Sequence, residues 1–254
     1  MKLKLFTNKS VHENAAYYYE LAKEAKKKIK GTEKAIEETK KEMEKSRKKK
    51  KEEKKVRVKK EKKWFEKFHW FYTSEGKLAI GGKNAQQNDI VYKKHMEDND
   101  LFFHADIQGA SAVILKDGLD SAEGEMLEAA QFAASFSNAW KNGNASVDVY
   151  SVKKEQLSKH ATGGFIPAGA FAIKGKRNWF KNTRLGVKIG ISEHGLEILP
   201  DRSVRKMKNE VYLAPLKTGK EKGEISKFIA KKFDVDVTEI LELTPSGKSK
   251  IVKK

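Results

Sequence analysis

Three clusters of polar residues contain the side chains whose types and spacing could do chemistry. In the first cluster, residues 81–89, a Gly-Gly turn leads through Lys83 into four side-chain amides within five residues. Backbone N–H groups in such a turn, placed before a helix, can bind a phosphate. Amides exchange hydrogen bonds but transfer no proton, so the cluster favours contact with nucleotide groups over catalysis. The alternative is an amide-rich helix cap in a solvated turn. The candidate contacts are Lys83, Asn84, Gln86, Gln87 and Asn88.

The second cluster, residues 104–111, combines His104, Asp106, Gln108 and Ser111 at the end of a predicted strand. Members of a hydrolase triad normally come from separate elements, and the sequence around Ser111 lacks a nucleophile elbow. His104 and Asp106 have no third ligand at a spacing that suits a metal. We therefore expect no catalytic residue, metal or cofactor here, and count His104, Asp106 and Gln108 as binding residues. Two alternatives stay open: a buried His104 beside a loop held by Asp106, and a less favoured hydrolase or nuclease using His104, Asp106 and Ser111.

The third cluster consists of residues 159–164 and 174–181, in which basic side chains alternate with Trp and Phe beside glycines. This mixture suits phosphate contacts combined with stacking on a base or sugar. The pair Gly163-Gly164 is not a Walker motif, because no Lys-Ser or Lys-Thr follows it. Trp179 could equally belong to the core. The candidate contacts are Lys159, Lys174, Lys176, Arg177 and Trp179.

The elements that must position these clusters follow Trp64, where aromatic residues first become dense. Short segments rich in β-branched or aromatic residues predict strands, and two amphipathic segments, residues 84–96 and 121–140, predict helices capped by Asn84 and Ser121. The predicted strands are residues 68–72, 77–80, 101–105, 112–115, 147–152, 170–174 and 185–191. This pattern predicts an α+β domain over residues 64–194, with aromatic residues 64–72 in its core.

A small C-terminal α/β extension is expected over residues 195–254. It should contain a strand at 211–214, an amphipathic helix at 223–233 and a short helix opened by Asp236. Residues 244–254 are rich in Gly, Ser and Lys and predict a loose tail.

Composition limits the remaining possibilities. The chain has 254 residues, 54 Lys and Arg against 35 Asp and Glu, a formal net charge of +19 and no cysteine. Disulfide frameworks, thiolate metal sites and cysteine nucleophiles are thereby excluded. No apolar run could cross a bilayer and no signal peptide is visible, so we expect a cytoplasmic protein without a membrane partner. The charge indicates a polyanionic partner.

Most of that charge lies in residues 1–63, which hold 24 Lys and Arg and 11 Asp and Glu, a net +13. A 3-4 spacing of mostly small or apolar residues predicts a long coiled-coil helix, capped by Ser10 with Glu13 and ending before Trp64. Its seam is Ala15, Tyr18, Ala22, Ala25, Ile29, Thr32, Ile36, Thr39, Met43 and Ser46. Such a weak seam needs a partner helix, from a partner protein or by self-association; the lysines could also form a solvated face.

Taken in order, these motifs resemble the NFACT-R domain of the NEMF/RqcH family of ribosome-associated quality-control factors. The resemblance rests on residues 64–71, 81–88, 104–111, 157–159 and 173–178. The lysine-rich helix, with Asn14-Ala15 and Tyr18-Tyr19, resembles the C-terminal arm of the coiled coil in that family. Residues 195–254 match least.

The resemblance implies RNA binding without catalysis: contact with rRNA of the large ribosomal subunit and with tRNA on stalled complexes. The family usually has His where Gln108 stands, which weakens any catalytic role for this loop. The N-terminal domain and the first coiled-coil arm of the family have no counterpart here, so we expect a fragment or a split protein.

Overall fold

The computed structural model describes residues 4–53, 63–161 and 164–252. The chain divides into two compact units, residues 1–61 and 62–254, which are taken in turn. This division falls close to the boundary at residues 63 and 64 that the appearance of aromatic residues indicates.

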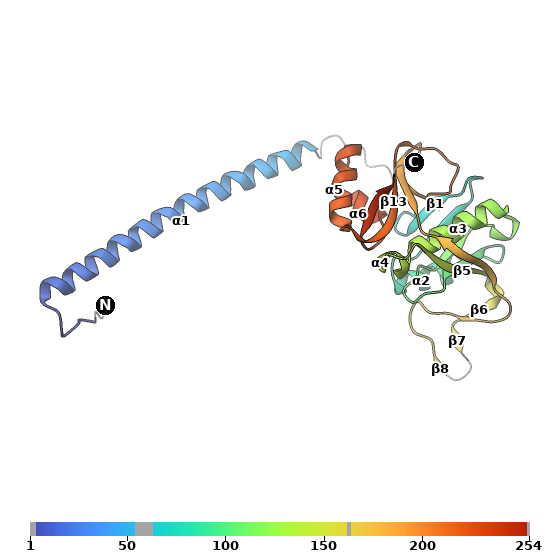
Figure 1. The fold of residues 1–254 in the computed structure, drawn as a ribbon, viewed down its shortest axis with the longest axis horizontal. Coiled ribbons are helices and arrows are strands. Elements are labelled where there is room, and N and C mark those ends of the chain that lie inside the picture. The colour runs from blue at the N-terminus through green and yellow to red at the C-terminus, as the bar shows by residue number, and fades with distance from the viewer. Residues whose placement is uncertain (1–3, 54–62, 162–163, 253–254) are drawn as a thin grey trace. The chain divides into compact units, whose positions relative to one another are not determined.

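The first unit contains one long helix, α1 (Val11–Glu53), shown in blue in Figure 1. The predicted capping box is confirmed: the Ser10 N–H donates to Glu13 Oε2 at 2.7 Å, and the Glu13 N–H donates to Ser10 Oγ at 3.3 Å. Asn14 is buried and fixes the preceding segment, because its side chain accepts from the Phe6 N–H and donates to the carbonyls of Phe6, Lys9 and Ser10.

The apolar seam of α1 is exposed in this structure. Ile29, Ile36 and Met43 are 58%, 51% and 62% exposed. The long helix is therefore confirmed, whereas its pairing in a coiled coil stays a prediction. Residues 54–62, which precede the expected end of this helix before Trp64, lie outside the described residues.

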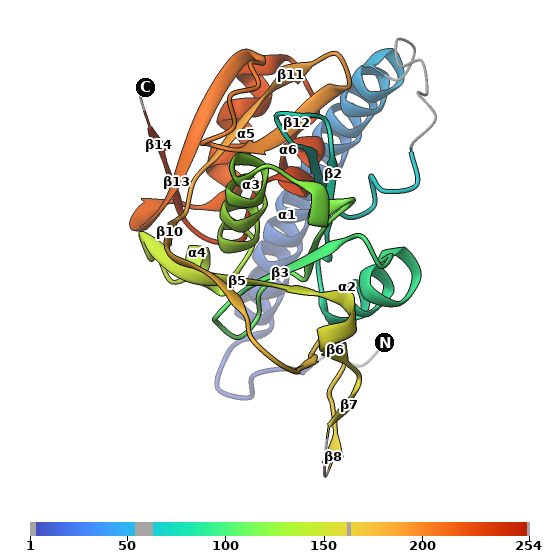
Figure 2. The same ribbon diagram turned by 90° about the vertical axis from the view of Figure 1, so that its right-hand side faces the viewer.

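The second unit is built on a six-stranded antiparallel sheet in the order β1-β2-β4-β3-β5-β10. Its strands are β1 (His69–Tyr72), β2 (Leu78–Gly81), β3 (Leu101–Ala105), β4 (Val113–Leu115), β5 (Ser146–Lys153) and β10 (Asn178–Arg184). Helix α3 (Glu123–Ser135) packs on β3, β4, β5 and β10 and also on β12 of a second sheet, so it lies between the two sheets (Figure 2).

The second sheet is four-stranded and antiparallel, in the order β12-β11-β13-β14. It comprises β11 (Val187–Ser192), β12 (Gly195–Pro200), β13 (Lys208–Lys220) and β14 (Ser249–Val252), with α5 (Lys222–Phe233) and α6 (Val237–Leu243) between its last two strands. The shorter elements are α2 (Ala85–Ile90), the π-helical η2 (Val91–His95), the 3-10 turns η3 (Gly118–Asp120) and η4 (Lys154–Gln156), α4 (Asn138–Lys141), β6 (Leu157–Ser158), β7 (His160–Ala161), β8 (Gly164–Phe165) and β9 (Ala172–Ile173).

Alternation along the strands gives the first sheet two buried faces. In β3, Phe103 faces the larger core, which α3, the second sheet, α5 and α6 complete. Its neighbour Phe102 faces a smaller core formed with Phe65, Phe68 and Val91. Successive side chains of a strand point to opposite faces, so this one strand contributes to both cores.

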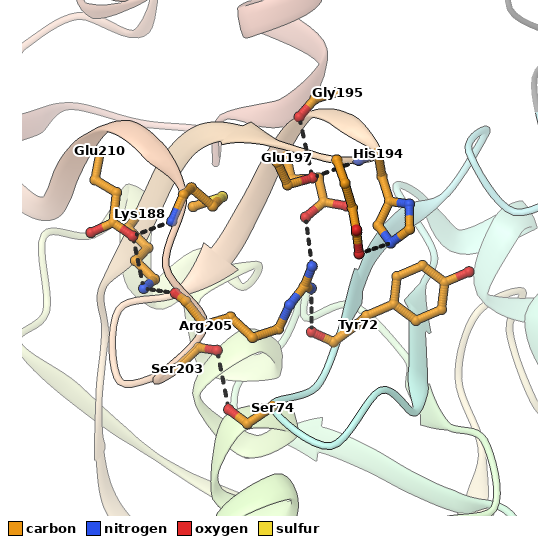
Figure 3. A network of polar contacts seen from close by, with 12 residues as sticks. Tyr72, Ser74, Lys188, His194, Gly195, Glu197, Ser203, Arg205 and Glu210 are labelled. Carbon is orange, nitrogen blue, oxygen red and sulfur yellow. Dashed lines mark hydrogen bonds and ion pairs between the residues drawn. The ribbon is translucent and has the colours of Figure 1, made fainter.

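A polar network joins the end of β1 to the second sheet (Figure 3). The Arg205 guanidinium donates to the Tyr72 carbonyl at 2.9 Å and pairs with Glu197 at 3.3 Å. Lys188 pairs with Glu210 at 3.1 Å on the neighbouring strands. These contacts fix the position of the second sheet relative to the first.

The expected α+β class is confirmed, its two large sheets are antiparallel, and several local predictions need correction. Residues 244–254 are not a loose tail throughout, because β14 pairs with β13. The helix predicted over 121–140 is interrupted, since α3 ends at Ser135 and the short α4 follows it. Trp64 is 49% exposed and lies outside the core that Phe65, Phe68 and Phe71 enter.

The expected boundary between residues 194 and 195 falls between β11 and β12, which pair with each other in the second sheet. The apolar residues of both strands belong to the larger core. Residues 195–252 thus complete the core shared with the preceding strands.

Candidate nucleic-acid interface

The first polar cluster forms the turn from β2 into α2. Asn84 caps α2 as predicted, with its side-chain oxygen accepting from the Gln87 N–H at 2.9 Å. Gln87 is also engaged: its side chain accepts from the Lys83 N–H and donates to the Lys67 carbonyl. Gln86 is exposed on the same turn. The turn therefore presents Lys83, Asn84 and Gln86 to solvent, while Gln87 stabilises it.

Asn88 is a structural residue within this cluster. It is 6% exposed, donates to the Ala110 carbonyl at 3.3 Å and accepts from the Ala112 N–H at 3.0 Å. Gly82 permits this arrangement, because a Cβ at that position would lie 2.2 Å from the Asn88 oxygen. Asn88 thus attaches α2 to the segment that contains the second cluster.

The second cluster leaves β3 on the face of the smaller core. The His104 ring lies parallel to Phe102 and close to Tyr150, and burial lowers the pKa of His104. Its Nδ1 atom is buried and has no hydrogen-bond partner within the described parts of the chain. Asp106 and Gln108 are exposed in the following loop, which Asn138 holds by donating to the Gln108 carbonyl.

Ser111 is placed for structure and not for attack on a substrate. It is 4% exposed, and its hydroxyl donates to the Gly82 carbonyl at 2.8 Å. A nucleophilic serine needs a general base within hydrogen-bond reach, whereas this hydroxyl is bonded to a backbone oxygen. In the described ranges, no group of three or more His, Asp or Glu residues could hold a metal ion.

The first two clusters meet in one cleft with a volume of about 850 Å³. Lys83, Asn84 and Asn88 line one side, and His104 and Gln108 line another. The cleft also has a wall that the sequence did not predict: Lys222 at the start of α5 and residues 241–246 at the end of α6. His69 completes the cleft, with its ring stacked 3.9 Å from Phe136.

Lys159, from the third cluster, is engaged in holding the loop beside this cleft. Its ammonium group pairs with Asp89, donates to the Ala170 carbonyl at 2.6 Å and lies 4.2 Å from the Phe171 ring centre. Its side chain is 17% exposed. This site residue therefore joins α2 to the segment before β9, and its charge is balanced by a carboxylate. Thr162 and Gly163 of the same cluster lie outside the described residues.

Tyr150 of β5 and three residues of the third cluster form a cationic aromatic surface along β5 and β10. We call this surface the tryptophan platform, and it consists of Tyr150, Arg177, Trp179 and Lys181. Trp179 is 36% exposed and contacts Tyr150 edge-on at 5.4 Å. The Arg177 guanidinium lies 4.7 Å from the Tyr150 ring centre and 5.7 Å from that of Trp179, and Lys181 lies 4.1 Å from the latter.

Lys174 and Lys176 precede the platform and are exposed. The Gln156 side chain donates hydrogen bonds to both of their backbone carbonyls. These bonds fix the backbone of the loop that carries the two lysines. Tyr150 belongs to the platform and also lines the cleft. Through Tyr150 the two surfaces are continuous, so one extended ligand could contact both.

Comparisons with known proteins relate part of the chain to an RNA-binding family. Residues 67–175 match the family described as NFACT protein RNA binding domain. The archaeal Rqc2 homolog aRqcH of Methanocaldococcus jannaschii is 40% identical over 208 residues, which is 78% of this chain and 31% of that protein. The ribosome quality control complex subunit NEMF of Homo sapiens is 36% identical over 173 residues, covering 65% and 16%. These similarities support the NEMF/RqcH ribosome quality-control family for the segment that they cover.

The chain spans about a third of the archaeal family member and less of the human one. A solved structure of the C-terminal part of the fibronectin/fibrinogen-binding protein from Streptococcus suis is 27% identical, covers 51% of this chain and 50% of that one, and gives a TM-score of 0.41. The NFACT match includes the first two clusters, Lys159 and Lys174, and ends before the tryptophan platform residues of β10. Among the described residues no helix is long and apolar enough to cross a membrane.

Sequence reasoning missed several residues of this interface, including Tyr150, which it placed only within a predicted strand. Lys181 belongs to the third cluster, but its contact with the Trp179 ring depends on strand β10. The many basic residues in this segment hid the alternating pattern that would predict a strand. His69 and Lys222 carry no local signal, because only the fold brings them to the cleft.

Proposed function

We propose that residues 62–254 bind rRNA of the large ribosomal subunit, tRNA, or both, on stalled ribosomal complexes. The match to the RNA-binding family supports this proposal, and so do the names of the relatives, which are ribosome quality-control proteins. The single observation that carries it is the tryptophan platform: an exposed indole with two cations over its ring, on a sheet face that continues into a polar cleft.

The chemistry of the platform suits a single-stranded or splayed segment of RNA. A base can stack on Trp179 whatever its identity, which contributes about 1–3 kcal/mol per base in comparable proteins. Arg177 is held over Tyr150 and can neutralise the flanking phosphate without losing much conformational freedom on binding. The amide side chains of Asn84, Gln86 and Gln108 can then hydrogen-bond to sugar or base edges.

This function requires binding and no bond making. The hydroxyl of Ser111 is committed to the Gly82 carbonyl, so the hydrolase alternative loses its nucleophile. We therefore propose that this domain acts as a positioning module.

The direct test measures the affinity of the full chain for tRNA and for large-subunit rRNA fragments across a series of salt concentrations. We expect log K to fall linearly with log salt concentration, by about 0.7 per phosphate neutralised on a single strand. Trp179→Ala should weaken binding by about 5- to 150-fold, corresponding to the stacking free energy, and should leave the salt slope unchanged.

Trp64→Ala is the matched control, because Trp64 is also exposed but stacks on His95 away from the platform. It should retain full affinity. Salt-insensitive binding, or equal losses in both variants, would contradict the proposal.

We also propose that α1 pairs with a second helix. The exposed seam residues Ile29, Ile36 and Met43 support this, since single exposed helices gain stability mainly by burying an apolar stripe. Sedimentation of the full chain distinguishes the two sources of the partner. A dimer that Ile29→Glu with Ile36→Glu dissociates indicates self-association, and a monomer indicates a helix from another polypeptide.

A further inference from the structure

Lys222 lines the same cleft as Lys83 of the first cluster. It begins α5, far along the chain from Lys83 and outside the segment that matches the NFACT family. Two cations from distant parts of the chain therefore border one cleft.

The two lysines are close enough to affect each other. The pKa of Lys222 is lowered, first by burial and then by repulsion from Lys83. The same two lysines contribute to lowering the pKa of His69, after burial. Like charges near one another repel, and an anion bound between them relieves that repulsion and replaces the hydration that half-buried Lys222 has lost.

The described residues that line the cleft include few negative groups. No ion pair or side-chain hydrogen bond is recorded for Lys222 in the part of the chain that the structure describes. Of the described residues that line the cleft, Glu242 is the single carboxylate, and it is exposed. His69, with its pKa lowered to about 3, is neutral at physiological pH and adds no positive charge.

The fold holds Lys222 in this position. The N–H of Glu221 donates to Glu224 Oε2 at 3.3 Å at the start of α5, and Ile225 and Ile229 are buried in the larger core. Trp140 donates to Ser249 of β14 at 3.1 Å and fastens the neighbouring strand to α4. A rigid wall is what a preorganised anion site needs.

We propose that Lys83 and Lys222 together bind one backbone phosphate of the RNA, so that the C-terminal sheet and its helices form one wall of the RNA-binding cleft. The inference deepens the proposed function and rests on it. The amides of the first cluster and the loop at Gln108 lie beside this phosphate position, and the tryptophan platform continues from it through Tyr150.

Lysine footprinting of the unmodified full chain tests the contact without a variant. A small acylating ester is applied with and without a saturating single-stranded RNA, and modified peptides are quantified by mass spectrometry. We expect RNA to slow acylation of Lys83 and Lys222 by at least several-fold and to leave Lys227 unchanged. Lys227 is exposed and belongs to the same helix as Lys222.

In the second arm of the experiment, inorganic phosphate at millimolar concentration replaces the RNA. This comparison shows whether the cleft binds a polynucleotide or a free anion. Protection of both lysines by RNA supports the inference, whether or not phosphate protects them too. Protection by phosphate alone would overturn it, because the cleft would then hold a free anion.

Variants give an independent readout. Lys83→Ala combined with Lys222→Ala should reduce the salt slope of single-stranded RNA binding by about 0.7, the value for one phosphate. Lys227→Ala removes one charge from the same helix and should leave the slope unchanged. Glu242→Gln should raise the affinity for single-stranded RNA, because it removes a negative charge from the lining of the cleft.

The failure of this inference is distinguishable from failure of the proposed function. If RNA binds with a normal salt slope that depends on Trp179, yet Lys222 stays fully reactive and its removal changes nothing, the inference is wrong and the platform stands. If no RNA binds at any salt concentration, the proposed function itself is wrong and this inference falls with it.

Discussion

Asn88 shows how a motif residue can shape the proposed RNA site through its buried hydrogen bonds. Its buried amide joins α2 to the segment at residues 110–112, and the hydroxyl of Ser111 fastens that segment to Gly82. These bonds set the width of the cleft. The residues that remain for contact are the exposed ones, with Lys83, Gln108 and Trp179 among them.

Asn88→Ala should therefore destabilise the fold by about 1–3 kcal/mol, because a buried backbone N–H and a buried carbonyl lose their partner. Chemical denaturation measures the free energy of unfolding. Gln86→Ala, two residues earlier on the exposed side of the same helix, is the control and should stay within about 0.5 kcal/mol of the parent. Equal effects would contradict the division between structural and contact amides.

His69 makes stability depend on pH. Burial, with repulsion from Lys83 and Lys222, lowers its pKa from 6.5 to about 3, so the unfolded chain binds the proton more tightly. Its contribution to stability is complete above pH 6.5 and is lost as the pH falls from there toward 3, at no more than ~1.4 kcal/mol per pH unit.

Denaturation series between pH 7 and pH 4 check this expectation. His69→Gln should reduce the pH dependence of the free energy of unfolding. His12→Gln is the control on exposed α1 and should leave that dependence unchanged. A parent protein whose stability rises on acidification over this range would contradict it.

At the scale of elements, prediction from sequence succeeded where the signal is local. The capping box of α1, the cap of α2 at Asn84 and the cap of α6 at Asp236 all depend on residues within one turn. Strand β3 matched its prediction because it opens with three consecutive apolar residues, Leu101, Phe102 and Phe103.

The failures have equally physical causes. Strand β10 reads as a basic loop, since Arg177, Lys181 and Arg184 mask its alternation and Asn182, with φ of 51°, breaks its register. Strand β14 is stabilised by pairing with distant β13, which its own Gly, Ser and Lys content does not reveal. The cleft wall at Lys222 was unpredictable for the same reason, because tertiary packing alone creates it.

Gly31 gives a prediction for α1. It lies in the helix interior, and a Cβ added there meets nothing within 4 Å. Gly31→Ala should stabilise the surrounding turns by about 0.5–1 kcal/mol, because alanine loses less backbone entropy on helix formation.

Amide hydrogen exchange of the full chain should then slow about two- to fivefold around residue 31, the factor that this free energy corresponds to. Gly76→Ala is the opposite case, because its φ of +91° disfavours a side chain, and it should destabilise the hairpin of β1 and β2. Faster exchange in Gly31→Ala would show that glycine is needed there.

At the scale of the whole molecule, the C-terminal sheet belongs to the binding unit. It shares the larger core with the first sheet and is fastened to β1 through Arg205, and the helices α5 and α6 between β13 and β14 contribute residues to the cleft lining. The positive charge of residues 1–63 draws attention to α1, yet the aromatic and amide groups suited to RNA lie in the second unit. Charge alone indicates a polyanion, and the arrangement of the cleft and platform narrows it to RNA.

Arg205→Met should cost about 3–5 kcal/mol, because it leaves Glu197, 1% exposed, as an unpaired buried carboxylate and frees the Tyr72 carbonyl. Thermal and chemical unfolding measure the loss. Lys206→Met removes the same charge from the adjacent exposed position and should have little effect. Equal stability of the two variants would mean that the network in Figure 3 does not hold the sheets together.

Ultraviolet crosslinking in cells, with identification of both the crosslinked peptide and the RNA, tests the central claim most directly. We predict crosslinks in peptides that contain Trp179 and the cleft residues around Lys83, joined to large-subunit rRNA and tRNA. Crosslinks confined to α1, or RNA without enrichment of those two classes, would contradict the assignment of this chain as a ribosomal RNA-binding module.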